Sequence, residues 1–290
     1  MHQLTDEFLT ALSAAGSIGE ARRLQDELAA GRPVEDDIEV RRERIGGVEV
    51  EWVTAPGGHS DRVLLVIHGG GFRFGSLSSH RRLLSHLARR TGWSTLGIDY
   101  RLAPEHPFPA AAEDVRAVHD ALVADPDIRH LAIAGDSAGG ALAAGLVFGL
   151  READTKVPSA LVLLGPWLDL TVSGSTFVSN ASTDPLVSTA GMRSAAEMYL
   201  DGVAPLDPAA SPLFASLEGF PPVLLQASSS EALLDDSRRF AARLLEAGAE
   251  ARLEVYPELV HGWHQYADFL PEAAEAIDSI AAFLERVATD

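Results

Sequence analysis

The chain has 290 residues, of which 47% are hydrophobic and 22% are charged, so it can bury the core of one large α/β domain. Its formal net charge of −19 disfavours binding to nucleic acid or to an anionic membrane surface. The chain has no cysteine, which excludes disulfides, thiol nucleophiles and thiolate zinc sites.

The N-terminal region is expected to be helical over residues 1–31, because apolar residues recur there at helical spacing before Gly31-Arg32-Pro33. Its start is acidic and lacks the basic segment of a secretory signal, and no apolar run reaches the roughly 18 residues that span a bilayer. We therefore expect a soluble, cytoplasmic protein. Residues 38–45 and 48–53 follow as two strand-like segments around Gly46-Gly47, a pattern that predicts a hairpin.

A regular alternation of strands and helices occupies most of the remaining chain. Short apolar runs predict strands at residues 63–67, 94–98, 131–134, 161–164, 223–226 and 252–256. Helices are predicted between and after them, at residues 79–90, 110–124, 138–150, 235–247 and 272–287. This order predicts an α/β fold with a mostly parallel sheet that helices cover on both faces.

Two stretches, residues 1–36 and 168–215, do not belong to that alternation. The second contains one helical patch, near residues 192–200, and is too long for a structureless connection. We interpret the two stretches as parts of a cap over the carboxyl end of the sheet, where open α/β sheets bind ligands. The core then comprises residues 37–167 and 216–290. Three apolar residues of the first stretch are expected either to wall a substrate pocket or to pack on the core: Phe8, Leu9 and Leu12.

The string Gly135-Asp136-Ser137-Ala138-Gly139 lies directly between a predicted strand and a predicted helix. A sharp strand-to-helix turn with small neighbours exposes a serine hydroxyl at the positive end of the helix. Ser137 is therefore a candidate nucleophile, and the alternative is a serine that only caps the helix.

A second glycine-rich string, His68-Gly69-Gly70-Gly71-Phe72, follows the strand at residues 63–67. Consecutive glycines allow backbone N–H groups to turn toward an oxyanion. No phosphate-binding glycine pattern accompanies the single lysine, Lys156. We expect His68 to orient this loop and not to act as a base.

The proline-rich string from Asp99 to Pro109 follows the next strand and is expected to be rigid. We interpret it as a structural brace for the glycine loop, and its Arg101 and Glu105 are close enough in sequence to pair. His106 stands between Glu105 and Pro107 and is not expected to be a base.

A nucleophilic serine needs a base, and the base needs an acid that orients it. His261 stands between the last predicted strand and the last helix, and Glu231 follows the strand at residues 223–226. The order Ser137, Glu231, His261 is that of α/β-hydrolases. Asp235 and Asp236 are competing candidates for the acid, although acids near a helix N-terminus also have a structural explanation. His264 could join His261 only in a metal site that lacks a third ligand, so no metal is expected.

Together these strings resemble the hormone-sensitive-lipase-like family of α/β-hydrolases, the bacterial family IV esterases. The resemblance covers most of the chain through HGGGF at 68–72, DYRLAPEHPFPAA at 99–111, GDSAGG at 135–140, PWLDL at 166–170, EALLDDS at 231–237 and HGW at 261–263. It implies a helical cap on an eight-stranded, mainly parallel sheet. It also implies a serine carboxylesterase that hydrolyses short- to medium-chain acyl esters without a metal or other cofactor.

The resemblance assigns roles to individual residues. Ser137 matches the nucleophile, His261 matches the base, and Glu231 falls where the family has its triad acid, usually an aspartate. The backbone N–H groups of Gly69, Gly70, Gly71 and Ala138 match the oxyanion hole. The EALLDD context resembles a branch that contains monoterpene-lactone hydrolases and acetyl-hydrolases. Phe72 and Trp263 flank the motifs, and they are expected either to line the substrate pocket or to pack in the core.

Several alternatives share these motifs. A lactone hydrolase or an acetyl-hydrolase would use the same triad, and plant gibberellin receptors share the fold as ligand-binding proteins without the base. The presence of His261 disfavours such a receptor-like module. Asp136 is disfavoured as the nucleophile, because the serine occupies the exposed position of the turn. Interfacial lipase action is also disfavoured, because the sequence shows no broad apolar surface that could bind a lipid interface. We expect a small ester or lactone as the binding partner. The resemblance also allows a homodimer, because homodimers are common in the family.

Overall fold

The computed structural model describes residue 10 and residues 15–289. In this part of the chain, eight strands form one sheet in the order β1-β2-β4-β3-β5-β6-β7-β8. β2 is antiparallel to both of its neighbours, and the other pairs are parallel. The strands are β1 (Glu39–Ile45), β2 (Val48–Thr54), β3 (His59–Ile67), β4 (Trp93–Ile98), β5 (His130–Asp136), β6 (Ala160–Leu164), β7 (Val223–Ser228) and β8 (Ala251–Tyr256).

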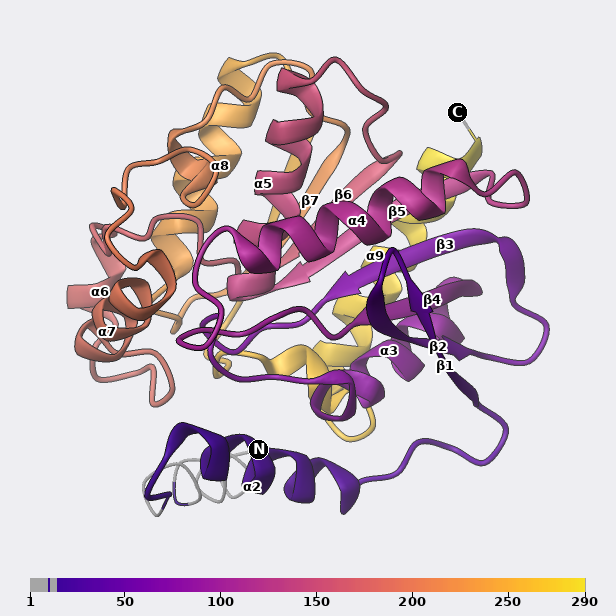
Figure 1. Ribbon diagram of the computed structural model, residues 1–290, viewed down its shortest axis with the longest axis horizontal. Coiled ribbons are helices and arrows are strands. Elements are labelled where there is room, and N and C mark those ends of the chain that lie inside the picture. The colour runs from indigo at the N-terminus through magenta and orange to yellow at the C-terminus, as the bar shows by residue number, and fades with distance from the viewer. Residues whose placement is uncertain (1–9, 11–14, 290) are drawn as a thin grey trace.

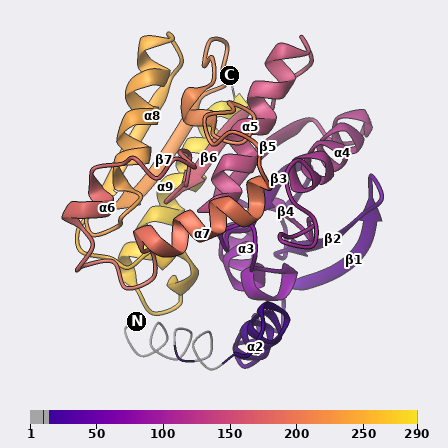
Figure 2. The ribbon, with the colours of Figure 1, turned by 60° about the vertical axis from the view of Figure 1, so that its left-hand side comes forward.

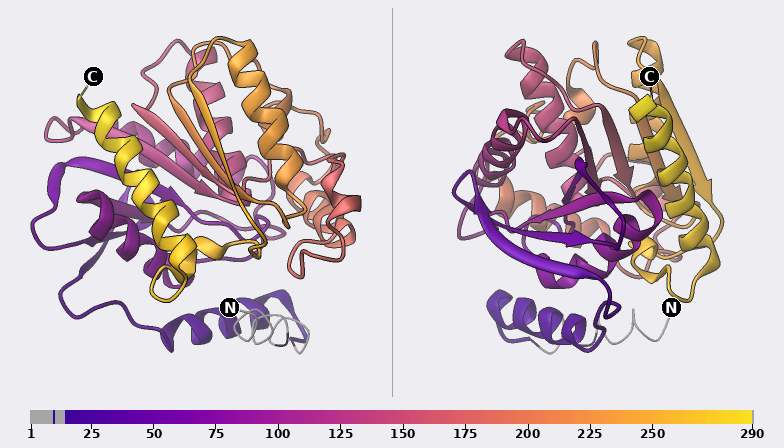
Figure 3. Two further views of the ribbon diagram at one scale, coloured as in Figure 1. Left: turned by 180° about the vertical axis from the view of Figure 1, so that it is seen from behind. Right: turned by 90° about the vertical axis from the view of Figure 1, so that its right-hand side faces the viewer.

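Helices cover both faces of this sheet, as Figure 3 shows from two sides. One face carries α3 (Leu77–Thr91) and α9 (Pro271–Thr289), and the other carries α4 (Ala110–Ala124), α5 (Ala138–Glu152) and α8 (Leu234–Glu246). The predicted α/β alternation is confirmed, with boundaries that differ from the predicted ones by a few residues at most.

The central strand β3 shows why the apolar runs of the sequence form strands. Its Val63, Leu65 and Ile67 pack in the cluster with α4, α5 and α8, whereas Leu64 and Val66 pack with α3 and α9. Successive side chains of a strand point to opposite faces, so a strand that is covered on both sides needs apolar residues at every position.

Before the sheet, the structure describes one long helix, α2 (Ile18–Ala30), in the region predicted to be helical. It begins after Ser17, whose side chain accepts a hydrogen bond from the Glu20 N–H, and Gly31 follows its end. The helix buries only Ala21 and lies beside the core rather than within it (Figure 2). Phe8, Leu9 and Leu12 lie outside the described residues.

The long segment after β6 contains α6 (Thr176–Ser179), α7 (Thr189–Leu200) and the 3₁₀ turn η1 (Pro212–Phe214). Figure 1 shows α6 and α7 beyond the arrowheads of the parallel strands, at the carboxyl end of the sheet. α7 matches the predicted helical patch, but α6 and η1 were not predicted. A further 3₁₀ turn, η2 (Trp263–Tyr266), precedes α9.

None of the helices over residues 15–289 combines the length and apolarity that a crossing of the bilayer requires.

Candidate active site

Ser137 lies at the junction of β5 and α5, in the conformation expected of an exposed nucleophile. Its φ and ψ are 52° and −117°, a strained backbone geometry for a residue with a side chain. It is the N-terminal cap residue of α5, but its side chain makes no capping hydrogen bond. The strain therefore serves to project the hydroxyl, and the positive end of α5 lies beside it.

This turn requires glycine at the second position after the serine. A Cβ atom on Gly139 would lie 2.1 Å from the carbonyl oxygen of Ile67 and 2.7 Å from that of His68. α5 therefore packs directly on the end of β3, where the glycine-rich loop begins. The small residues of the GDSAG string thus bring Ser137 and the glycine loop together.

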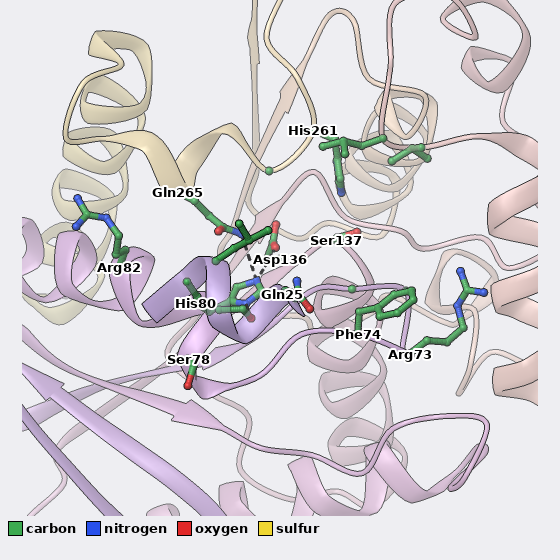
Figure 4. Close-up of a pocket in the computed structure, with 18 of the residues that line it drawn as sticks. Gln25, Arg73, Phe74, Ser78, His80, Arg82, Asp136, Ser137, His261 and Gln265 are labelled. Carbon is green, nitrogen blue, oxygen red and sulfur yellow. Dashed lines mark hydrogen bonds and ion pairs between the residues drawn. The ribbon is translucent and has the colours of Figure 1, made fainter. Parts of the chain in front are cut away.

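A cavity of about 570 Å³ opens above Ser137. Figure 4 shows Ser137 and His261 on its wall, with the histidine ring turned toward the serine. Its remaining walls come from the glycine loop, from α2, from the start of α3, from α7 with the residues before it, and from η2. Apolar wall residues include Leu28, Phe74, Leu186, Val187, Met192 and Ala195. This size is typical of a small-molecule site.

His261 and Glu231 come together from the loops after β8 and β7. The Nδ1 atom of His261 lies 3.3 Å from Oε1 of Glu231, whose other oxygen accepts a hydrogen bond of 2.9 Å from the Ser228 N–H. A Cβ atom on Gly165, whose φ is 48°, would lie 3.0 Å from the Glu231 carboxylate and 3.1 Å from the His261 ring, so any side chain there would press on this pair.

Burial and the contact between them change the pKa of both groups. Burial would lower the pKa of His261, but the Glu231 carboxylate outweighs it, and the pKa is raised above its usual value. Burial also raises the pKa of Glu231, and the imidazole opposes that rise. An acid held against one ring nitrogen favours the tautomer whose other nitrogen can take a proton from Ser137.

The loop that carries Glu231 is fastened by residues of the long segment after β6. The Asn180 side chain donates hydrogen bonds to the carbonyl oxygens of Ser229 and Glu231 at 2.9 and 2.8 Å. The Asp184 carboxylate accepts from the Ala232 N–H at 2.8 Å. Sequence reasoning missed both residues, because they lie in an irregular segment without a recognisable motif.

Asp235, the competing candidate for the acid, is engaged elsewhere. Its carboxylate accepts a hydrogen bond of 2.9 Å from the Ser175 N–H. Asp236 is buried and accepts from the Leu168 and Asp169 N–H groups at 2.8 and 3.0 Å. Of the three acids, Glu231 is the one that contacts His261.

The three glycines of the loop differ in their surroundings. Gly70 and Gly71 line the cavity, whereas the N–H of Gly69 is directed at the Nε2 atom of His80, 3.3 Å away. Ala138, the first residue of α5, follows the serine directly. Backbone N–H groups beside the nucleophile can stabilise a developing oxyanion, so Gly70, Gly71 and Ala138 are the better placed donors.

The proline-rich string braces this loop. The Tyr100 hydroxyl donates to the carbonyl oxygen of His68 at 2.9 Å, and the Ala103 N–H donates to that of Phe72 at 2.9 Å. Burial lowers the pKa of His68 to about 3, so its ring is neutral, and Nδ1 lies 2.8 Å from the Gly69 carbonyl oxygen. His68 thus contacts the loop that it was expected to orient.

Arg101 and Glu105, which are close enough in sequence to pair, each have another partner. Arg101 contacts Glu113 and Asp114 in the first turns of α4 at 3.0 and 2.9 Å. Glu105 instead pairs with Arg22 of α2 at 2.8 Å.

Phe72 and Trp263 are core residues rather than cavity residues. Both are almost completely buried, and neither is among the residues that form the cavity wall. Phe72 stacks on Tyr199 with ring centroids 3.7 Å apart, and Trp263 packs against Tyr256 at 4.7 Å. Of the two roles considered, the structure supports packing.

His264 turns away from His261 into the core, where its Nε2 atom lies 3.2 Å from Oε1 of Gln226. Within residues 15–289, no group of three or more histidine, aspartate or glutamate side chains is arranged to hold a metal ion.

Comparison with known proteins agrees with this geometry. A family profile described as an alpha/beta hydrolase fold matches residues 64–265. The chain belongs to the α/β-hydrolases. An acetyl-hydrolase of Streptomyces hygroscopicus is 42% identical over 247 residues, which are 84% of this chain and 82% of that protein.

Solved structures place this α/β-hydrolase in a narrower group. A crystal structure of an esterase from the bacterial hormone-sensitive lipase family superposes with a TM-score of 0.95 and 40% identity, covering 99% of this chain and 97% of that one. EstE5, whose crystal was soaked by p-nitrophenyl butyrate, has a TM-score of 0.91 and 33% identity over 99% of each chain. The protein is therefore a carboxylic ester hydrolase of the hormone-sensitive lipase family.

Proposed function

We propose that this hydrolase is a serine carboxylesterase that acts on short- to medium-chain acyl esters, with Ser137 as nucleophile, His261 as base and Glu231 as the orienting acid. The observation that carries the proposal is the shared cavity. Ser137, in its strained turn, and His261, held by a buried carboxylate, line the same space of about 570 Å³.

The reaction proceeds in two halves. His261 takes the proton of the Ser137 hydroxyl while the serine oxygen attacks the ester carbonyl. The N–H groups of Gly70, Gly71 and Ala138 stabilise the oxyanion that forms, and His261 returns the proton to the departing alcohol. Water then attacks the acyl-serine with His261 again as base, which releases the carboxylic acid and restores the Ser137 hydroxyl.

We infer that a cap encloses the cavity and that the acyl group of the substrate is small. We assign residues 1–36 and 168–215 to a cap, because α2 and α7 both contribute to the wall. The 42% identical relative is named an acetyl-hydrolase, and EstE5 was soaked by a butyrate ester, so both names agree with a small acyl group. No observation favours the lactone-hydrolase or receptor-like alternatives.

The test is hydrolysis of p-nitrophenyl esters from acetate to palmitate by the wild type and by Ser137→Ala. We expect turnover that is highest for acyl chains of two to about eight carbons, and a loss of several orders of magnitude in the variant. Labelling of the wild type by an organophosphate should add one phosphoryl group to Ser137. Near wild-type turnover by Ser137→Ala would contradict the proposal.

A further inference from the structure

A second histidine lies beside the nucleophile, and the mechanism above does not use it. His80 lies in the first turns of α3, is 4% exposed, and has its Nε2 atom 3.1 Å from Oδ2 of Asp136. Asp136 immediately precedes Ser137 and is 6% exposed. Figure 4 shows His80 and Asp136 beside Ser137 among the residues that line the cavity. A buried carboxylate needs such a partner, because burial alone penalises its charge.

The pair also contacts the start of the oxyanion loop. The Nε2 atom of His80 lies 3.3 Å from the Gly69 nitrogen. A Cβ atom on Gly69 would lie 2.6 Å from Asp136 Oδ2 and 3.0 Å from the Cβ of Ser137. Gly69 is therefore packed between the His80–Asp136 pair and the nucleophile. A shift of either side chain would be transmitted to Gly70 and Gly71, the next residues along the chain.

His80 is itself held in place. Its Nδ1 atom lies 2.8 Å from the hydroxyl of Ser79, which belongs to the capping box at the start of α3. On the other side, the Gln265 amide nitrogen of η2 lies 3.5 Å from Nε2. Because both ring nitrogens have neighbours, the orientation of the ring is fixed.

We propose that His80 is a positioning residue, which through Asp136 and Gly69 holds the oxyanion loop against the nucleophile turn so that the Gly70 and Gly71 N–H groups point at the reacting carbonyl. The proposal rests on the function proposed above. It predicts that removal of the His80 ring weakens binding of the transition state more than binding of the substrate.

The test compares His80→Phe, which keeps a ring but removes its nitrogens, with His80→Gln, whose amide nitrogen can replace Nε2. The readouts are kcat and KM for p-nitrophenyl butyrate and the affinity for a trifluoromethyl ketone, which forms an oxyanion on Ser137. We expect His80→Phe to lose about 10–100-fold in kcat with little change in KM, and ketone affinity to fall in parallel. His80→Gln should recover part of both losses.

The matched control is His119→Phe. His119 is a buried histidine on α4 that contacts Asp120, outside the cavity wall, and its replacement should leave kcat and ketone affinity near wild type. If His80→Phe does not fold, the isosteric Asp136→Asn takes its place. It must likewise lower kcat with little change in KM.

Unchanged kcat in His80→Phe, or a loss of kcat without a loss of ketone affinity, would overturn the proposal. Failure of the proposed function is distinguishable, because it would appear as activity that survives in Ser137→Ala.

Discussion

Two imidazole–carboxylate pairs flank Ser137, and they differ in how the ring nitrogens are used. In His261–Glu231, the carboxylate contacts Nδ1, and the ring lies on the same cavity wall as Ser137 (Figure 4). In His80–Asp136, the carboxylate contacts Nε2 and the Ser79 hydroxyl contacts Nδ1. The separations of 3.3 and 3.1 Å are nearly equal. The comparison teaches that a short contact with an acid does not by itself identify a base, because both histidines have one and only His261 is proposed as the base.

The largest expected effect separates the two histidines. His261→Asn should lower kcat/KM for p-nitrophenyl butyrate by about 10⁴–10⁶-fold, because no other group can take the serine proton. The corresponding loss in His80→Phe should be smaller by at least about 100-fold. Steady-state kinetics on both variants, with circular dichroism to verify folding, measures the difference. Equal losses of kcat/KM in His261→Asn and His80→Phe would contradict the assignment of one as base and the other as positioning residue.

The next effect concerns Glu231, the carboxylate of the proposed catalytic pair. Glu231→Gln should lower kcat by about 10³–10⁴-fold, because the amide no longer stabilises the imidazolium or fixes its tautomer. Asp235→Asn, the control on the neighbouring helix, should change kcat by less than about tenfold. The same ester assay decides between them. An inactive Asp235→Asn beside an active Glu231→Gln would reverse the assignment of the acid.

A smaller effect is the pH dependence of the reaction. The carboxylates of Glu231, Asp184 and Asp136 act on His261, and the net result is a raised pKa despite burial. A raised pKa keeps the base protonated at neutral pH, so kcat/KM should increase as pH rises above 7. In Glu231→Gln, the midpoint of this rise should move to lower pH. A profile of kcat/KM from pH 5 to 10 measures the midpoints of the wild type and of Glu231→Gln. Identical midpoints would contradict an effect of the Glu231 carboxylate on the pKa of His261.

The smallest effect involves Asp236, a buried carboxylate without an imidazole partner. Burial raises its pKa to about 7, although two backbone N–H groups donate to it. The folded protein therefore holds a proton that the unfolded chain releases near pH 4, and the free energy of unfolding falls as pH rises from about 4 to 7. Asp236→Asn should raise Tm by about 2–4 °C at pH 8 and by little at pH 5. A lower Tm of the variant at pH 8 would contradict this.

Much of the fold could be predicted because its signals are local. The apolar run at residues 63–67 predicts a central strand, and the structure adds polar residues from His59, which extend the strand beyond the covered part of the sheet. The expected triad residues followed from motifs that each lie at a strand end. Parallel strands bring their carboxyl ends to one edge, so distant motifs meet there.

The remaining features depend on contacts between distant parts of the chain. His80 stands 56 residues from Asp136, and nothing in its own helix marks it as different from any other buried histidine. Asp184 is 48 residues from Ala232, which it fastens. Nearness in sequence allows Arg101 to pair with Glu105, whereas in the folded chain Arg101 contacts Asp114. Such pairings are set by packing, which the sequence pattern does not show.

The attachment of α2 has a consequence for engineering this enzyme. The helix is fastened through polar groups: Arg22 contacts Glu105 and the carbonyl oxygens of Arg73 and Ala103, while Gln25 accepts from the Gly75 N–H. Leu28, which faces the cavity, is 40% exposed. Ester selectivity can therefore be varied at Leu28 with little loss of buried apolar area, provided that the polar attachments are kept.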